Sequence, residues 1–153
     1  MFVRNLLLLV GLSVLLAGCS TGRYSGYDYA ASHSASPTEM GSRYLLGRGV
    51  PQNNEMAFSY FSQAGEEDPS AQNELGYMYA TGKGTTQDYR KAIYYYEKAA
   101  NNGLASAQYN LGLLYLHGLG TEPNKTVAMK WFQLSAAHGF EPAKQALKKY
   151  QTS

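Results

Sequence analysis

A repeat of 35 to 36 residues constrains this sequence more than any other feature. Glycines recur in register at Gly41, Gly76 and Gly112, at Gly47, Gly82 and Gly118, and at Gly49, Gly84 and Gly120. The same spacing relates three alanines and three aromatic pairs: Ala57, Ala92 and Ala128, and Tyr60-Phe61, Tyr95-Tyr96 and Trp131-Phe132. Such a period predicts a solenoid whose units bury a core by stacking on each other.

Each unit is predicted to contain two helices. In the second unit Ala71, Leu75 and Tyr79 lie four residues apart, which is the spacing of one helical face. A Gly-x-Gly turn follows, where glycine takes the positive φ that ends a helix. We expect Asp88 and Asn124 to cap the N-termini of the second helices in units two and three. The unit is therefore a helical hairpin.

Glycine also occurs in the middle of the predicted first helices, at Gly76 and Gly112. A glycine there costs about 1 kcal/mol relative to alanine, so a packing reason is expected. We expect the second helix to approach closely at these points, with Tyr95 and Trp131 filling the space beyond. Both rings are placed on the inward face, which explains the high aromatic content without a ligand.

The second unit resembles the Sel1-like repeat family, relatives of tetratricopeptide repeats, at residues 75–84 (LGYMYATGKG) and 88–92 (DYRKA). The first unit departs from the family pattern: Met40 replaces the usual leucine, and residues 65–69 form a shorter connection whose stacking angle stays open. The resemblance implies an all-α solenoid of about three repeats and a C-terminal capping helix, in which Lys148 replaces the glycine. The expected boundaries are 36–69, 70–104 and 105–140 for the repeats and 141–153 for the capping helix and tail.

The N-terminus is typical of an exported bacterial protein. Arg4 precedes an apolar run at residues 6–16, which is shorter than the roughly 20 residues of a membrane-spanning helix. Residues 1–18 are therefore predicted to be a signal peptide. Leu16, Ala17 and Gly18 followed by Cys19 resemble the lipobox of bacterial lipoproteins. That resemblance implies that Cys19 becomes the first residue and carries acyl chains, and two or more chains anchor a protein stably.

Residues 19–35 show no helical or strand period and are predicted to be a flexible tether. Ser20 follows the lipidated cysteine, whereas enterobacterial lipoproteins retained at the inner membrane typically have aspartate there. Under that rule the expected location is the periplasmic face of the outer membrane.

No catalytic or metal-binding constellation is apparent in the sequence. His33, His117 and His138 do not form an i, i+4 ligand pair, and Cys19 is the single cysteine. The net charge of +2 is too small to concentrate nucleic acid. We therefore expect no enzyme activity, cofactor, metal or small-molecule substrate, and no nucleic-acid partner.

The predicted partner surface follows from related superhelices, in which the first helices line a concave groove. On the first helices of units two and three, the outward positions predicted to contact a partner are Asn73, Tyr77, Tyr109, Leu113 and Leu116. Tyrosine offers rigid contact area and a hydroxyl, and it is enriched at binding hot spots. The alternative is that these side chains pack on neighbouring repeats or on the capping helix.

The sequence therefore predicts a membrane-anchored scaffold or adaptor of the bacterial cell envelope that binds protein partners. Some cysteine-rich Sel1-type proteins have been linked to cell-wall or β-lactam chemistry, so a cell-wall-related enzyme or β-lactam-interacting protein is one alternative. This chain lacks their cysteine pairs. A purely structural spacer is another.

Overall fold

The computed structural model describes residues 35–151, and every regular element in that range is an α-helix. The helices are α2 (Pro37–Leu46), α3 (Asn54–Ala64), α4 (Pro69–Thr81), α5 (Tyr89–Asn101), α6 (Ala105–His117), α7 (Lys125–Ala137) and α8 (Glu141–Gln151). The predicted all-α solenoid with a final capping helix is confirmed. The predicted signal peptide, the lipobox residues Leu16, Ala17 and Gly18, and Cys19 lie outside the described residues.

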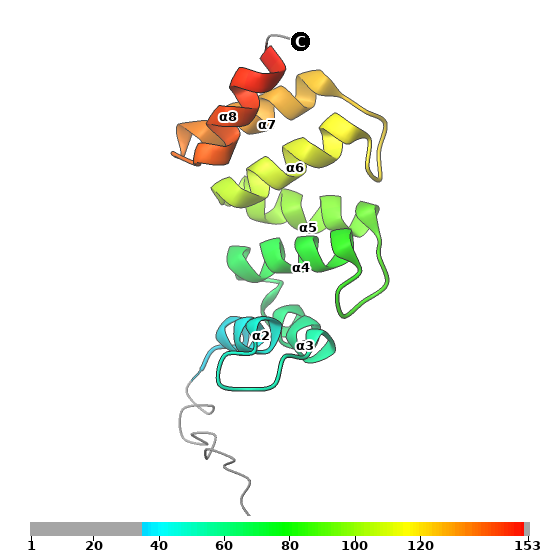
Figure 1. The fold of residues 1–153 in the computed structure, drawn as a ribbon, viewed down its shortest axis with the longest axis vertical. Coiled ribbons are helices and arrows are strands. Elements are labelled where there is room, and N and C mark those ends of the chain that lie inside the picture. Colours follow the sequence, from blue (N-terminus) through cyan, green and yellow to red (C-terminus); the bar gives the residue numbers. More distant parts are fainter. Residues whose placement is uncertain (1–34, 152–153) are drawn as a thin grey trace, which may run out of the picture.

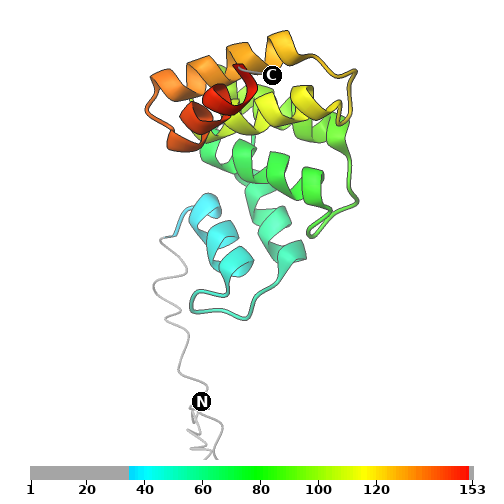
Figure 2. The same cartoon turned by 45° about the horizontal axis from the view of Figure 1, so that its top comes forward.

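Three hairpins, α2/α3, α4/α5 and α6/α7, stack along the molecule and α8 covers the last of them (Figure 1). The first helices of the hairpins and α8 lie on one side, and the second helices lie on the other (Figure 2). A hydrogen bond between Asn110 on α6 and Asn73 on α4 joins neighbouring first helices directly. We call the outward surface of α2, α4, α6 and α8 the first-helix face.

Local sequence explains where the helices begin and end. The side chains of the predicted N-caps Asp88 and Asn124 accept hydrogen bonds from backbone N–H groups in the first turns of α5 and α7. Helices α2, α4 and α6 all end in a glycine in the left-handed region, with φ of 68° at Gly47, 74° at Gly82 and 64° at Gly118. Both predictions about helix ends are therefore confirmed.

The mid-helix glycines allow close contact with a ring of the paired helix. A Cβ at Gly76 would lie 2.6 Å from Cδ1 of Tyr96, and one at Gly112 would lie 2.6 Å from Cε1 of Phe132. In the first hairpin Gly41 faces Phe61 in the same way. The expected close approach of the second helix is thus confirmed at Gly76 and Gly112, and the first hairpin shows the same packing at Gly41.

The rings predicted to fill this space were wrong by one residue. Tyr96 and Phe132 cover the glycines, not Tyr95 and Trp131. One residue on a helix corresponds to a turn of about 100°, so Tyr95 points elsewhere and stacks on Tyr79, with centroids 5.6 Å apart and planes at 8°. Trp131 packs at the edge of the apolar cluster between α5 and α6.

The apolar core lies mainly between successive hairpins. Three clusters of buried residues join α3 to α4, α5 to α6 and α7 to α8: Ala57, Phe61, Ala71, Leu75 and Met78; Ala92, Tyr96, Ala99, Ala100, Ala107, Leu111 and Leu114; and Ala128, Phe132 and Ala146. Each cluster combines the second helix of one hairpin with the first helix of the next. A single hairpin therefore cannot bury these residues without its neighbour.

Both ends of the stack carry charged residues where the interior has apolar or small ones. Arg43 on α2 occupies the repeat position of the buried Met78 and Leu114, and it forms an ion pair with Glu39 at 2.6 Å. Lys148 on α8 occupies the position of the mid-helix glycines, as the sequence indicated. Arg43 and Lys148 therefore place charge at repeat positions that are apolar or small inside the stack.

The first hairpin is oriented differently from the others. In Figure 1 α2 and α3 are seen nearly along their axes, whereas α4 to α7 run across the view. Gly65, the C-cap of α3, has φ of −65°, whereas the equivalent connections contain Gly103 and Gly139 at φ of 83° and 82°. The shorter connection noted in the sequence therefore coincides with a changed stacking angle.

Asp68 joins the first two hairpins. Its carboxylate caps α4 by accepting from the Ser70 N–H, and it also accepts a 2.5 Å hydrogen bond from the Thr38 hydroxyl on α2. Partial burial raises the pKa of Asp68, but the hydrogen bonds from Thr38 and from the backbone outweigh this effect and hold the pKa below its ordinary value.

Candidate partner-binding surface

The five residues predicted to contact a partner are all half-buried in the structure. Tyr109 lies against Phe132 and Phe140, with ring centroids 5.6 Å and 5.5 Å away. Leu113 and Leu116 pack against the α7/α8 cluster. Packing on the neighbouring hairpin and on α8 therefore takes up part of the surface of all three α6 residues, as the alternative proposed.

Tyr77 on α4 has a different environment. Its ring packs at the edges of both the α3/α4 and the α5/α6 clusters, so it spans a repeat junction. The Lys83 ammonium donates a 2.6 Å hydrogen bond to the Tyr77 hydroxyl and lies 4.9 Å from its ring centroid. Packing at the junction positions the ring, and Lys83 contacts its hydroxyl.

A chain of polar contacts crosses the first-helix face from α4 to α6. The Asn110 amide donates to the side-chain oxygen of Asn73 at 3.4 Å, and the Asn73 amide donates to the Glu74 carboxylate at 3.2 Å. Of the three residues, only Asn73 was predicted. The repeat could have identified Glu74 and Asn110, because both precede a mid-helix glycine by two residues. Glu39 has the same position in the first unit.

Glu74 is a half-buried carboxylate without a counter-charge. Within residues 35–151 the ion pairs are Arg43–Glu39, Lys98–Glu66 and Lys144–Glu141, and none includes Glu74. Burial raises the pKa of Glu74, and the hydrogen bond from Asn73 only partly offsets this. Burial also raises the pKa of Tyr96, and the charge on Glu74 raises it further.

The sign of the Glu74 shift determines its effect on stability. A pKa that is higher in the folded state means that the folded protein binds this proton more tightly than the unfolded chain. The group therefore stabilises the fold at acid pH, and that contribution is lost as the pH rises through the folded-state pKa. At neutral pH the charged Glu74 weakens the fold.

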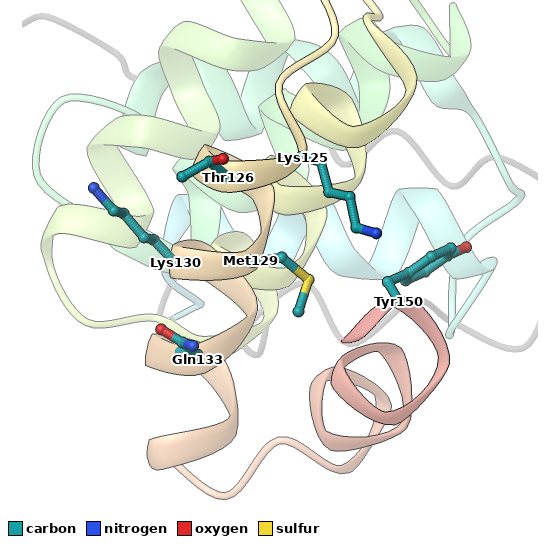
Figure 3. A pocket seen from close by; sticks show the side chains of 6 residues that line it. All are labelled: Lys125, Thr126, Met129, Lys130, Gln133 and Tyr150. Carbon is teal, nitrogen blue, oxygen red and sulfur yellow. The ribbon is translucent and has the colours of Figure 1, made fainter. Parts of the chain in front are cut away.

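An open hollow of about 480 Å³ lies on the outer side of α7, beside the end of α8 (Figure 3). Its lining residues are Lys125, Thr126, Met129, Lys130, Gln133 and Tyr150. Lys125 and Met129 lie toward Tyr150, whereas Lys130 and Gln133 lie further from it and Lys130 points away (Figure 3). The polar groups therefore do not converge on one point, as a catalytic site would require.

The histidines lie apart from one another. His117 is exposed at the end of α6, the Nδ1 of His138 lies 3.1 Å from the Gln108 amide oxygen, and His33 is outside the described range. Nowhere between residues 35 and 151 do three His, Cys, Asp or Glu side chains gather as metal ligands would. In the same range, no helix combines the length and apolar character that crossing a bilayer requires.

A known sequence family matches this chain in three segments that correspond to the three hairpins. The sequence pattern of the Sel1 repeat matches residues 38–68, 69–104 and 105–140. The chain belongs to the Sel1 repeat family. Sel1 repeat proteins generally act as non-catalytic scaffolds for protein interactions.

Solved structures share this fold with TM-scores between 0.63 and 0.71. A Sel1 repeat protein from Oxalobacter formigenes is 33% identical, with a TM-score of 0.66 over 70% of this chain and 44% of that one. The protein c5321, a protective antigen of uropathogenic Escherichia coli strains, is 35% identical, with a TM-score of 0.71 over 77% and 26%. Cysteine-rich protein B of Helicobacter pylori is 29% identical, with a TM-score of 0.63 over 75% and 87%.

This Sel1 repeat chain thus spans less than half the length of the first two structural relatives. No curated protein sequence matches it. Its single cysteine, Cys19, also distinguishes it from the cysteine-rich relative, because one cysteine cannot form a disulfide within the chain.

Proposed function

We propose that this Sel1 repeat protein is a membrane-anchored adaptor of the bacterial cell envelope, without catalytic activity, that holds a segment of a partner protein on its first-helix face. The observation that carries the proposal is the set of fixed groups that α4 and α6 place on this face. Tyr77 is held by Lys83, and Asn73 links Glu74 to Asn110. Half-buried, pre-positioned side chains bind at low entropic cost.

The anchoring part of the proposal rests on the sequence. Leu16, Ala17 and Gly18 precede Cys19 as in a lipobox, and acyl chains on Cys19 would attach the protein to a membrane. Ser20 after the cysteine supports the periplasmic face of the outer membrane as the location.

Replacing Tyr77 with alanine should reduce the capture of envelope proteins by about tenfold or more, because a tyrosine that acts as a binding hot spot contributes about 2 kcal/mol or more. Capture is measured by pull-down from solubilised envelopes of the producing cells, with quantitative identification of the bound proteins. Tyr109→Ala should have a similar effect on binding, together with a loss of stability, because its ring also packs on Phe132 and Phe140.

Tyr94→Ala is the matched control, because Tyr94 is a tyrosine of α5 that is 53% exposed. It should bind as the unmodified protein does. Circular dichroism melts identify any variant that loses binding by unfolding. Equal capture by the Tyr77→Ala and Tyr94→Ala variants would contradict a partner site on the first-helix face.

A further inference from the structure

Glu74 is the charged group of the first-helix face whose environment is least favourable. It is half-buried, hydrogen-bonded by the neutral Asn73 amide, and part of no ion pair within the described chain. The other carboxylate at the same repeat position, Glu39, is neutralised by Arg43. Removing a carboxylate from water without a counter-charge is costly, and an incoming cation recovers much of that cost.

We propose that the first-helix face recognises a lysine or arginine side chain of the partner segment, which forms an ion pair with Glu74. This inference rests on the proposed function and names the chemistry of the partner at that site. An ion pair at a half-buried carboxylate contributes more than an exposed one such as Lys98–Glu66, whose glutamate side chain is 82% exposed.

The neighbours of Glu74 suit a basic side chain. The Asn73 amide donates to one carboxylate oxygen at 3.2 Å and carries no charge of its own. The ammonium of Lys83 donates its hydrogen bond to the Tyr77 hydroxyl and does not form an ion pair with Glu74 within the described residues. A single carboxylate among neutral amides and hydroxyls lacks the several anionic ligands that a metal site requires, which favours a protein cation over a metal ion.

The test uses an array of randomised peptides, each about ten residues long, incubated with the fluorescently labelled protein. The bound peptides should be enriched in lysine or arginine relative to the array as a whole. For the selected peptides, Glu74→Gln should weaken affinity at least fivefold, because the substitution removes the charge and keeps the shape. Replacing the basic residue of a peptide by norleucine should weaken its binding to the unmodified protein as much as Glu74→Gln does. The same replacement should weaken binding to the Glu74→Gln protein only slightly, because the ion pair is already absent.

Glu55→Gln is the matched control, since Glu55 is an exposed glutamate in the first turn of α3. It removes the same charge and should leave affinity within twofold. The melting temperature of the Glu74→Gln protein at neutral pH should equal or exceed that of the unmodified protein, because the charged carboxylate weakens the fold. Weaker binding by an equally stable protein separates recognition from a structural role.

The possible outcomes distinguish this inference from the proposed function. Peptides that bind the first-helix face without a preference for basic residues would overturn the role of Glu74 and leave the adaptor function standing. If no peptide of the array bound the protein, the result would count against both the role of Glu74 and the adaptor function. Sedimentation of the purified protein tests a second copy as the occupant: a dimer that Glu74→Gln dissociates would overturn the proposal of a basic partner segment.

Discussion

Gly112→Ala should lower the free energy of unfolding by about 2–3 kcal/mol, as overpacking of a well-packed core typically does. Helix propensity alone predicts the opposite, a gain of about 1 kcal/mol. The added Cβ would lie 2.6 Å from Cε1 of Phe132 and 3.2 Å from the Ala128 carbonyl oxygen. The ring is completely buried and packs between Tyr109 and Tyr150, so it has little space to move.

Urea denaturation followed by circular dichroism measures this effect. Gly49→Ala is the control, because its Cβ would meet no atom within 4 Å and the strain would come only from φ of 72°, at a cost of about 1 kcal/mol. Adding Phe132→Leu to the Gly112→Ala protein should recover part of the loss. A Gly112→Ala protein as stable as the original would contradict the close packing of α6 on α7.

Two buried glutamines at equivalent repeat positions should respond differently to replacement by leucine. Gln108→Leu should cost about 1–2 kcal/mol, because the Gln108 amide donates to the Ala100 carbonyl at 3.0 Å and its oxygen lies 3.1 Å from Nδ1 of His138. Gln72→Leu should change stability by less than about 0.5 kcal/mol or raise it. The Gln72 amide makes one 3.4 Å contact, and its buried oxygen has no hydrogen-bond partner.

The two glutamines differ in whether the residue thirty positions later in the sequence is a hydrogen-bond partner. His138 reaches Gln108, whereas Asn102, the equivalent residue for Gln72, donates instead to the carbonyl of Lys98 at the end of its own helix. Thermal melts of the two single variants and of the double variant test this account. Equal losses at the two positions would show that the repeat position alone, and not the local partner, determines the contribution.

The period of the sequence was enough to predict the hairpins, their caps and the close approach at the mid-helix glycines. It was not enough to predict which ring of each aromatic pair covers a glycine. Adjacent rings such as Tyr95 and Tyr96 repeat with the same period, and only the rotation of the second helix about its axis distinguishes them. The orientation of the first hairpin depends on the connection at residues 65–69, where the repeat itself is broken.

The candidate site was predictable in position and only partly in chemistry. The spacing placed Asn73 and Tyr77 on the first-helix face, but whether Glu74 has an ion-pair partner within residues 35–151 depends on side chains of other helices. Packing of Tyr109 against Phe140 likewise depends on the connection to α8, which is not part of the repeat pattern. A sequence shows which residues share a face, whereas their partners across helices require the structure.

The most direct test of the account is site-specific photo-crosslinking in the producing cells, with a photoreactive amino acid at position 77 or at position 94. Position 77 lies on the first-helix face and position 94 is exposed on α5. Position 77 should form a discrete crosslinked product with the same partner in repeated experiments, and position 94 should not. A partner crosslinked from position 94 and absent from position 77 would contradict this prediction.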